Sequence, residues 1–364
     1  MNSKERFLTA LEHAEPDRVP IFANLTPQVG QRLGRELGFP GEAVMSRLSQ
    51  RVSHNEILMH LGNDAIAIRP SWPNQVQDRW KQNELVDDFG FEFTRIGYYA
   101  EVAKRPLAHA ETIEDIEAFH TPDPLLPETW EFVEKQISRY GQDFGVIGDL
   151  ETTIFELSWN LVGLEKFIVD LMTEKPYVPV LLDKILDYSS AIGKRMVELG
   201  ADVIWTGDDF GTQKGMLVSP DLWRRHFKPR MKTLFEMLKN TNSKVKIAYH
   251  SCGSILPIVP DLVEIGLEIL NPIQPTAKDM DLGELKKTYG RNLAFFGGVD
   301  MQQVLPFGTV KEVEQEVKLR IRQAGSGGGF VIAPAHNIQP DTPTENIYAF
   351  FDAVKKFGTY PLDL

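Results

Sequence analysis

The chain has 364 residues and a formal net charge of -12 at pH 7. This acidity disfavours nucleic acid or an anionic membrane as the main partner, because a phosphate-rich surface is bound by a concentrated basic face. Hydrophobic residues make up 42 % of the chain and charged residues 25 %, which excludes a fibrous or disordered protein. The length suits either one large barrel domain with extended loops or two smaller domains.

The sequence shows no sign of export or membrane insertion. Residues Met1–Arg6 run straight into an amphipathic helical pattern without the apolar core of a signal peptide. No apolar run reaches the roughly 20 residues of a membrane span. We therefore expect a cytoplasmic protein. Cys252 is the single cysteine, which excludes an internal disulfide and every metal site that needs several cysteines.

Short apolar runs rich in β-branched residues alternate with helical patterns along the chain. Eight of these runs are predicted as strands: Arg18–Asn24, Asp64–Ile68, Phe144–Gly148, Asp202–Thr206, Val245–Tyr249, Leu267–Asn271, Leu293–Phe296 and Phe330–Ala333. Helices are predicted between and after them: Pro176–Leu199, Pro220–Lys239, Ser254–Ile265, Gly283–Thr288, Val310–Ala324 and Pro343–Lys356. The alternation fits a parallel α/β barrel, (β/α)8, or a doubly wound sheet, and the number of strands favours the barrel.

A glycine-rich run at Gly325–Gly329 is the nearest thing to a linker in the sequence. An apolar strand follows it at once, so the run is interpreted as a tight helix-to-strand connection and not as a domain boundary. We therefore expect one domain, a (β/α)8 TIM barrel with N-terminal helices, over residues 1–364.

One segment departs from the alternation of strands and helices. Glu84–Phe93 has an acidic turn and alternating aromatic residues, which predicts a β-hairpin inserted near the barrel mouth. Seven aromatic residues gather around it: Trp72, Trp80, Phe89, Phe91, Phe93, Tyr98 and Tyr99. They are interpreted either as a cap over the mouth or, more usually for aromatic residues, as packing that holds the hairpin against the barrel.

Polar residues at the C-terminal ends of barrel strands face the ligand site, and histidines follow two of the predicted strands. One strand runs into His250 and Cys252, and the last one runs toward His336. The His-x-Cys spacing places two ligands on the same side of an extended segment, and His336 qualifies as a third ligand from another strand. A Cys/His/His set is an ordinary zinc shell with one position open for substrate. A buried apolar cysteine beside a hydrogen-bonded histidine is the alternative interpretation.

Two further strand ends carry carboxylates. Glu151 follows one strand, and the adjacent Asp208 and Asp209 follow the next. Adjacent side chains point in different directions, so one aspartate is expected in the pocket, where it could bind metal, act as acid or base, or anchor substrate. Capping of a helix N-terminus is the competing interpretation, more so for Asp208 than for Asp209. Capping is also favoured for Asp300, which follows another strand end.

Several motifs resemble the uroporphyrinogen decarboxylase superfamily over nearly the whole chain. The segment His336–Ile347, with Pro-Asp-Thr-Pro followed by Glu-Asn, is similar to the C-terminal signature of that family. Supporting motifs are Asp17–Pro20, the Ser-Pro pair at Ser219 and the strand end Phe296–Asp300. The resemblance implies a barrel with its active site at the C-terminal ends of the strands.

Two chemistries occur within this superfamily. True uroporphyrinogen decarboxylases use no metal and carry an N-terminal arginine-rich segment that binds the carboxylates of the tetrapyrrole. The matching stretch here, Val19–Gln28, contains no arginine, which argues against that substrate, because buried unpaired anions are very costly. The corrinoid-dependent methyltransferases instead build a zinc site from His-x-Cys and a later cysteine. His250 and Cys252 match that pair, whereas His336 replaces the later cysteine, which disfavours a thiol acceptor such as coenzyme M and suits activation of an oxygen.

The resemblance therefore implies a zinc-dependent methyltransferase that moves a methyl group from a small methylated donor, such as an aryl methyl ether, to a corrinoid. The chain has no Asp-x-His-x-x-Gly motif for cobalamin, so the corrinoid is expected on a separate protein. The candidate site residues are His250, Cys252 and His336 for the metal, Asp209, Glu151 and His336 for catalysis, and Tyr249, Trp205, Phe210 and Asn337 for substrate. The alternatives are a metal-free decarboxylase or lyase acting on a smaller carboxylated substrate and a non-catalytic barrel that binds a small molecule or corrinoid.

Overall fold

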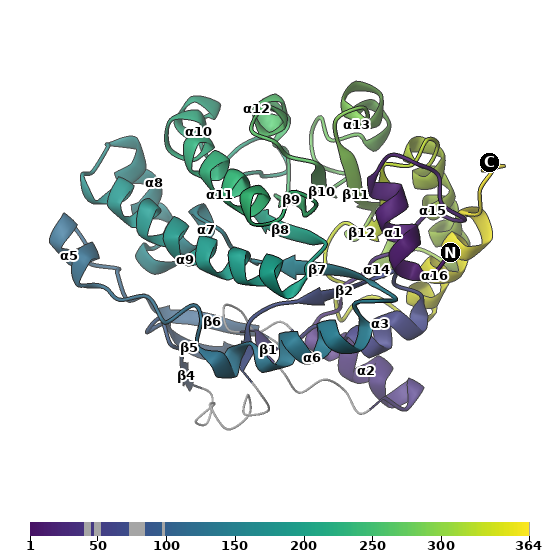
Figure 1. The fold of residues 1–364 in the computed structure, drawn as a ribbon, viewed down its shortest axis with the longest axis horizontal. Coiled ribbons are helices and arrows are strands. Elements are labelled where there is room, and N and C mark those ends of the chain that lie inside the picture. The colour runs from purple at the N-terminus through teal and green to yellow at the C-terminus, as the bar shows by residue number, and fades with distance from the viewer. Residues whose placement is uncertain (40–44, 47–51, 73–83, 97–98, 364) are drawn as a thin grey trace.

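A computed structural model describes residues 1–39, 45–46, 52–72, 84–96 and 99–363. Seven parallel strands form one curved sheet in the order β12–β11–β10–β9–β8–β7–β2 (Figure 1). Their bounds are β2 (Ala65–Ile68), β7 (Gly145–Asp149), β8 (Val203–Gly207), β9 (Lys246–His250), β10 (Ile269–Ile273), β11 (Ala294–Val299) and β12 (Phe330–Pro334). Each coincides closely with a predicted strand. The predicted barrel-type α/β fold is therefore confirmed.

The eighth position of the barrel is occupied by the irregular segment Arg18–Leu25, which lies between β12 and β2. On one side, Ile21 pairs in parallel with Ile332, and the Phe22 N–H donates to the Ile332 carbonyl at 3.1 Å. On the other side, the side-chain amide of Asn63 accepts from the Ala23 N–H at 2.9 Å and donates to the Ala23 carbonyl at 3.0 Å. The regular strand predicted at Arg18–Asn24 is thus wrong in detail, because the side chains of Asn63 and Asp64 supply hydrogen bonds on this edge beside the backbone bond from the Asp64 N–H to the Ile21 carbonyl.

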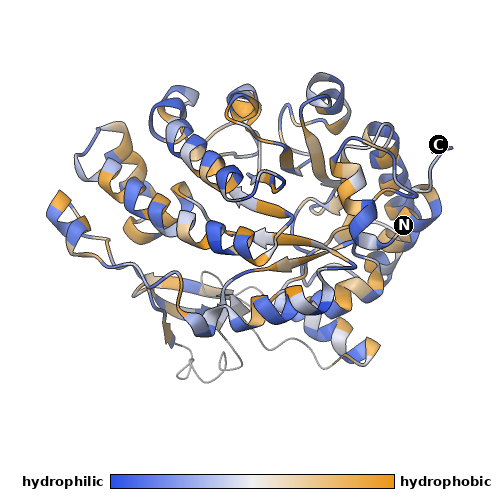
Figure 2. Ribbon diagram, in the orientation of Figure 1, coloured by the Kyte–Doolittle hydropathy of each residue, from blue (hydrophilic) through white to orange (hydrophobic). Residues whose placement is uncertain are grey.

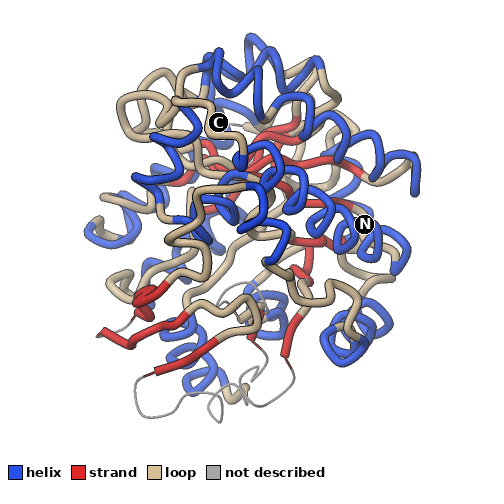
Figure 3. Tube along the Cα trace, turned by 90° about the vertical axis from the view of Figure 1, so that its left-hand side faces the viewer, coloured by secondary structure: helices blue, strands red, loops and turns tan. Residues whose placement is uncertain are grey.

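The helices that follow β7 to β12 lie outside the strands, and Figure 3 shows them as an outer layer around the sheet. They are α7 (Phe155–Val162), α8 (Leu164–Met172), α9 (Tyr177–Leu199), α10 (Pro220–His226), α11 (Lys228–Thr241), α12 (Val259–Glu264), α13 (Leu282–Tyr289), α14 (Val304–Phe307), α15 (Val310–Ala324) and α16 (Thr344–Phe357). The single helix predicted at Pro220–Lys239 is divided into α10 and α11. Pro229 lies in the first turn of α11, where its missing N–H is tolerated, and this favours a new helix start.

The N-terminal half adds further helices, and one of them closes the barrel. These are α1 (Ser3–Leu11), α2 (Pro27–Leu37), α3 (Asn55–Leu61), α5 (Ile113–Ala118) and α6 (Glu131–Tyr140). Phe7 of α1 is fully buried and packs against Gly145 at the start of β7, where an added Cβ would lie 2.4 Å from the Phe7 ring. Helix α1 therefore closes the N-terminal end of the barrel. Among the described residues, no helix combines the length and apolarity needed to cross a bilayer.

The barrel strands are apolar on both faces (Figure 2). In β2, Ala65 and Ala67 belong to the small cluster inside the barrel, whereas Ile66 and Ile68 belong to the larger core between strands and helices. Burial on both faces explains why these strands appear in the sequence as continuous apolar runs without polar alternation. The interior cluster includes Phe22 and Phe296, which form the floor of the site described below.

A separate three-stranded antiparallel sheet consists of β4 (Glu84–Val86), β5 (Glu92–Ile96) and β6 (Tyr99–Lys104). The predicted hairpin corresponds to β4 and β5, whereas β6 was not predicted. Phe89 and Phe91 of the turn are buried, and the Phe89 ring lies 5.2 Å from that of Tyr188 on α9. This favours the packing interpretation for these two aromatic residues. Trp80 and Tyr98, and the side chains of Trp72 and Tyr99, lie outside what the structure describes. A short pair, β1 (Met45–Ser46) with β3 (Ser71–Trp72), completes the strands.

Candidate active site

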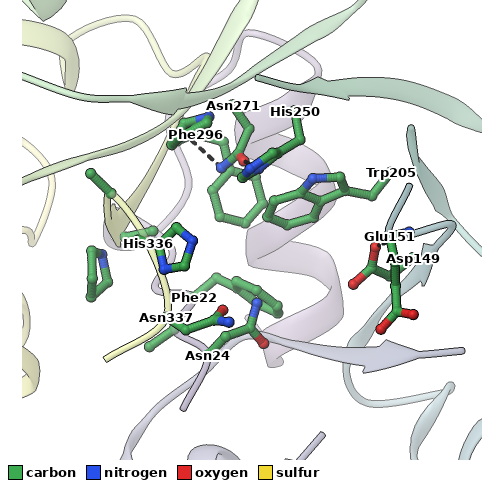
Figure 4. A pocket seen from close by; sticks show the side chains of 15 residues that line it. Phe22, Asn24, Asp149, Glu151, Trp205, His250, Asn271, Phe296, His336 and Asn337 are labelled. Atoms are coloured by element: carbon green, nitrogen blue, oxygen red, sulfur yellow. Dashed lines mark hydrogen bonds between the residues drawn. The ribbon is translucent and has the colours of Figure 1, made fainter. Parts of the chain in front are cut away.

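A cavity lies at the C-terminal ends of the barrel strands, where the strand-end argument places the site (Figure 4). Segment 22–24, strands β7 to β12 and the chain after β12 all contribute to its wall. Five of the predicted site residues line it: Glu151, Trp205, His250, His336 and Asn337.

Beside this cavity, Asp209, His250 and Cys252 form a group that could hold a metal ion. One ligand atom from each lies within 4.8 Å of the other two. The Cys252 Sγ is 3.5 Å from His250 Nε2, and Asp209 Oδ1 is 3.6 Å from the same nitrogen. Thiolate sulfur, imidazole nitrogen and carboxylate oxygen are all ligands that zinc accepts in proteins. The chemistry of the donor set therefore fits zinc.

Asp209 reaches this group because two strand-end loops touch. The Cys252 N–H donates to Asp209 Oδ1 at 2.7 Å, and the Ser254 N–H donates to the Thr212 carbonyl at 2.8 Å. An added Cβ at Gly211 would lie 2.4 Å from the Cys252 carbonyl oxygen, so the approach requires a glycine. The loop after β8 is thereby held against the loop that carries the His-x-Cys motif.

His336, the predicted third metal ligand, is not part of the group around Cys252. It follows β12, and the sheet order places β10 and β11 between that strand and β9. His336 is exposed and lines the same cavity, and in the view of Figure 4 it stands at the edge opposite Asp149 and Glu151. The structure thus groups Asp209, and not His336, with His250 and Cys252.

The imidazole of His250 is oriented by Asn271, the third residue of β10. His250 Nδ1 lies 2.6 Å from Asn271 Oδ1, and Asn271 Nδ2 donates to the Phe296 carbonyl at 3.0 Å. Since the amide oxygen of Asn271 faces the ring, Nδ1 of His250 carries the proton and Nε2 presents its lone pair to Cys252 and Asp209. Asn271 was missed, although it ends a predicted strand and the strand-end argument would have found it.

Among the residues that the structure describes, Arg69, Asp149 and Glu151 lie together at the edge of the cavity next to β7. Arg69, which follows β2, contacts Asp149 Oδ2 at 2.7 Å through Nη2 and Glu151 Oε1 at 3.2 Å through Nε. The Ser46 hydroxyl donates to Glu151 Oε2 at 2.6 Å. All of these side chains are buried. Arg69 and Asp149 also follow or end a strand, so the same argument would have identified them.

Two predicted substrate-binding residues lie elsewhere. Tyr249 and Phe210 are fully buried and are absent from the lining of the cavity. Tyr249 precedes His250 in an extended strand, so the two side chains point to opposite faces. Phe210 stacks on Phe155 of α7 with ring centroids 4.3 Å apart, in the core between strands and helices. Both residues therefore pack the barrel and do not form a pocket wall.

The capping interpretations agree with the contacts of Asp208 and Asp300. Asp208 is fully buried and accepts hydrogen bonds from the backbone N–H groups of Thr153, Ile154 and Glu156, at the start of α7. Burial raises the pKa of Asp208 to about 6, against the effect of these hydrogen bonds. Asp300 accepts from two N–H groups in the turn before α14. Of the two adjacent aspartates, Asp209 is therefore the one at the candidate site.

A family model for uroporphyrinogen decarboxylase (URO-D) matches residues 92–357. The methylcobamide:CoM methyltransferase MtaA of Methanosarcina barkeri is 28 % identical over 228 residues, which is 63 % of this chain and 63 % of that protein. The methylcobamide:CoM methyltransferase MtbA of Methanosarcina mazei is 25 % identical over 259 residues, 70 % of this chain and 71 % of that protein. The chain thus matches less than two thirds of the length of MtaA.

Decarboxylases and a solved structure are also similar to this chain. A uroporphyrinogen decarboxylase of Prochlorococcus marinus is 22 % identical over 279 residues, 73 % of this chain and 74 % of that protein. The structure of a methyltransferase from Methanosarcina mazei is 23 % identical, with a TM-score of 0.72 over 98 % of this chain and 99 % of that one. This likeness supports the barrel fold.

Proposed function

The chain belongs to the uroporphyrinogen decarboxylase family, and within that family we propose that it is a corrinoid-linked methyltransferase. The methyl group would pass from a small methylated donor, with an aryl methyl ether as the leading candidate, to the cobalt of a corrinoid on a separate protein. The similarity to two methylcobamide:CoM methyltransferases supports the corrinoid link. The replacement of a later cysteine by His336 argues against a thiol as the methyl acceptor and suits a donor whose methyl group is bound to oxygen.

The observation that carries this proposal is the group formed by Asp209, His250 and Cys252. Their ligand atoms lie within 4.8 Å of one another at the edge of the cavity, and Asn271 leaves Nε2 of His250 free to bind. We propose that these three residues hold zinc, with His336 near the open side. When bound, zinc would act as a Lewis acid and stabilise the oxygen that leaves the methyl group.

The remaining cavity residues would bind and orient the donor. Trp205 lies next to His250, with ring centroids 5.9 Å apart, and 5.0 Å from Phe296. The ring of Phe22 completes this wall at 5.9 Å from Trp205. An aromatic wall beside the metal ligands excludes water and gives a flat donor a surface for stacking.

The decarboxylase alternative rests on the family name and on the similarity to the Prochlorococcus enzyme. The lining of the cavity does not favour it. Phe22 and Asn24 come from the segment that is arginine-rich in true decarboxylases, and the described lining contains neither lysine nor arginine. A polycarboxylate would therefore find no cation in the described part of this wall.

Methyl transfer can be tested directly with purified components. The zinc-loaded chain, a methoxylated aromatic compound and a reduced corrinoid protein should together give the absorbance of methylcobalamin. Omission of the chain or of the corrinoid protein should abolish that signal. The proposal would be overturned if the chain demethylated the donor efficiently without any corrinoid.

The metal assignment has its own test, which is metal analysis of protein purified without chelator. We expect about one zinc per chain, with large losses in Cys252→Ala and Asp209→Ala, because a three-residue shell weakens sharply when one ligand is removed. His336→Ala should keep its zinc, because we propose Asp209, and not His336, as the third ligand. Full zinc content in Cys252→Ala would show that the site is elsewhere.

A further inference from the structure

We propose that the methyl donor carries a hydroxyl group besides its methyl ether, and that the side-chain amides of Asn24 and Asn337 bind this hydroxyl. The inference rests on the proposed function, since it names the class of donor in that reaction. Asn24 is thereby added to the donor site, and Asn337 acquires a defined partner.

The two asparagines lie side by side because their segments pair in parallel. Leu25 is bridged to Ile338, and the Ile338 N–H donates to the Asn24 carbonyl at 2.8 Å. The two bridged residues are buried in the core. Because neighbouring residues of an extended chain point to opposite faces, the preceding Asn24 and Asn337 share the face toward the cavity. Both line the cavity, and Figure 4 shows their amides next to each other.

The side-chain amides of both residues have no hydrogen-bond partner in the described ranges of the chain. The hydrogen bonds that these residues do make use their backbone carbonyls, and that of Asn337 accepts from Gln339 Nε2 at 3.1 Å. The amide of Asn271, in contrast, is bonded through both its oxygen and its nitrogen. The amides of Asn24 and Asn337 are half-buried, so a molecule that displaces water from them must replace the lost hydrogen bonds.

A hydroxyl group matches a pair of amides better than a charged group does. Each amide presents an NH2 group that donates and a carbonyl oxygen that accepts. A hydroxyl both donates and accepts, so it can bond to the oxygen of one asparagine and to the NH2 group of the other. A carboxylate only accepts and an ammonium only donates, so either one leaves some of the amide atoms unpaired. A donor without a polar group at this position would leave both amides unpaired, which is costly in a cavity closed to water.

The aromatic wall connects the two amides with the proposed metal group. The centroid of the Trp205 ring lies 5.9 Å from that of His250 and 5.9 Å from that of Phe22. Phe22 precedes Asn24 by two residues, and both line the cavity. A donor ring stacked on this wall would direct its methyl ether toward His250 and its hydroxyl toward Asn24. The amides would thus fix the orientation that methyl transfer requires.

The test is calorimetric binding of methoxybenzene and of the three methoxyphenol isomers to the purified full chain. These ligands share the ring and the methyl ether, and only the phenols carry a hydroxyl. At least one isomer should bind about tenfold more tightly than methoxybenzene, which is the effect of one or two well-formed hydrogen bonds. The inference would be overturned if no isomer bound more tightly than methoxybenzene.

Two variants assign this preference to the asparagines. Asn24→Ala and Asn337→Ala should each lower the affinity for the preferred isomer by about three- to tenfold, because each removes one partner of the hydroxyl. The affinity for methoxybenzene should change little, and zinc content should stay normal, since neither residue belongs to the candidate metal group. Asn292→Ala, at an exposed turn, is the matched control and should bind every ligand like the original protein.

Thermal denaturation checks that each variant folds, and the two substitutions lie in different segments, so each can serve if the other does not fold. Retention of the full preference by either folded variant would contradict the inference. Because binding requires neither a corrinoid protein nor turnover, this failure is distinguishable from failure of the proposed function. A chain that prefers a methoxyphenol but transfers no methyl group would overturn the function alone.

Discussion

The orientation of His250 depends on one contact, with Asn271. Asn271→Ala should lower zinc affinity by about 10- to 100-fold, because an unconstrained imidazole can rotate or carry its proton on Nε2. Asn271→Asp keeps an acceptor at the same position and should retain most of the affinity. Competition between the protein and a chelator of known affinity measures both values. Asn24→Ala removes another amide from the cavity wall and is the control. Unchanged affinity in Asn271→Ala would contradict the assigned role.

His54 predicts a loss of stability in acid. The ring is 3 % exposed, and neither nitrogen has a hydrogen-bond partner among the described residues. Burial, with a contribution from the charge of Arg69, lowers the pKa of His54 from 6.5 to about 4. Between these values the unfolded chain binds a proton that the folded chain does not, so stability is present above pH 6.5 and is lost toward pH 4. The loss should approach about 3 kcal/mol.

Urea unfolding at several pH values measures this effect. His54→Phe should reduce the loss of stability between pH 7.5 and pH 4 by about 3 kcal/mol, whatever its own stability at neutral pH. His120→Gln, at an exposed histidine, should keep the difference. An unchanged pH dependence in His54→Phe would show that other groups cause it.

At the scale of elements, the contact between the loops after β8 and β9 decides whether the candidate metal site is complete. Gly211→Ala places a methyl group 2.4 Å from the Cys252 carbonyl oxygen, so the loops must separate and Asp209 must move away from His250. We expect zinc affinity to fall by at least about tenfold, in the range seen when residues that orient metal ligands are changed. Lys214→Ala, at an exposed position of the same loop, should bind zinc normally. Normal binding by Gly211→Ala would refute the importance of the contact.

The strands were predictable because the barrel buries them on both faces, which gives continuous apolar runs such as Phe330–Ala333. The closing segment Arg18–Leu25 was not predictable in detail. Pro20 has no N–H to donate, and the hydrogen bonds on the β2 side come partly from the Asn63 side chain. No local pattern indicates that an asparagine 40 residues away will replace a strand partner.

The candidate site was predictable where a residue ends a strand, as His250 does, or follows one closely, as His336 does. Asp209 joins His250 and Cys252 through a contact between two loops, which sequence spacing does not reveal. Tyr249 could have been excluded from the pocket, since it alternates with His250 along β9 and both cannot face the cavity. The place of Phe22 and Phe296 in the cavity wall could not be predicted, because the sequence does not distinguish an aromatic residue that faces a cavity from one that is packed in the core.

For the molecule as a whole, stability depends on how the barrel closes. Asn63 makes two hydrogen bonds to the buried backbone of Ala23, and Asp64 accepts from Arg6, Arg18 and the Ile21 N–H. Asn63→Ala leaves two buried backbone groups unpaired, so the free energy of unfolding should fall by about 2–4 kcal/mol. Zinc content should remain normal, because the Asn63 side chain bonds to the backbone of Ala23 and not to Asp209, His250 or Cys252.

Denaturant unfolding and metal analysis of the same preparation test this separation of stability from binding. Asn292→Ala, at an exposed turn, should unfold like the original protein. If Asn63→Ala lost zinc without losing stability, the closing segment would have to affect the group of Asp209, His250 and Cys252 directly.

The closing segment also sets the order of events during synthesis. Thr26 bonds to Ile338, a residue 312 positions later in the chain, and the neighbouring residues Ile21 and Phe22 meet β12 in the same way. At about 5–20 residues per second, a nascent chain waits tens of seconds on the ribosome before that partner exists. During this interval β2 is the edge of an unfinished sheet, and its unpaired backbone invites association with other chains. The barrel can therefore close only near the end of synthesis, once β12 and the residues after it have been translated.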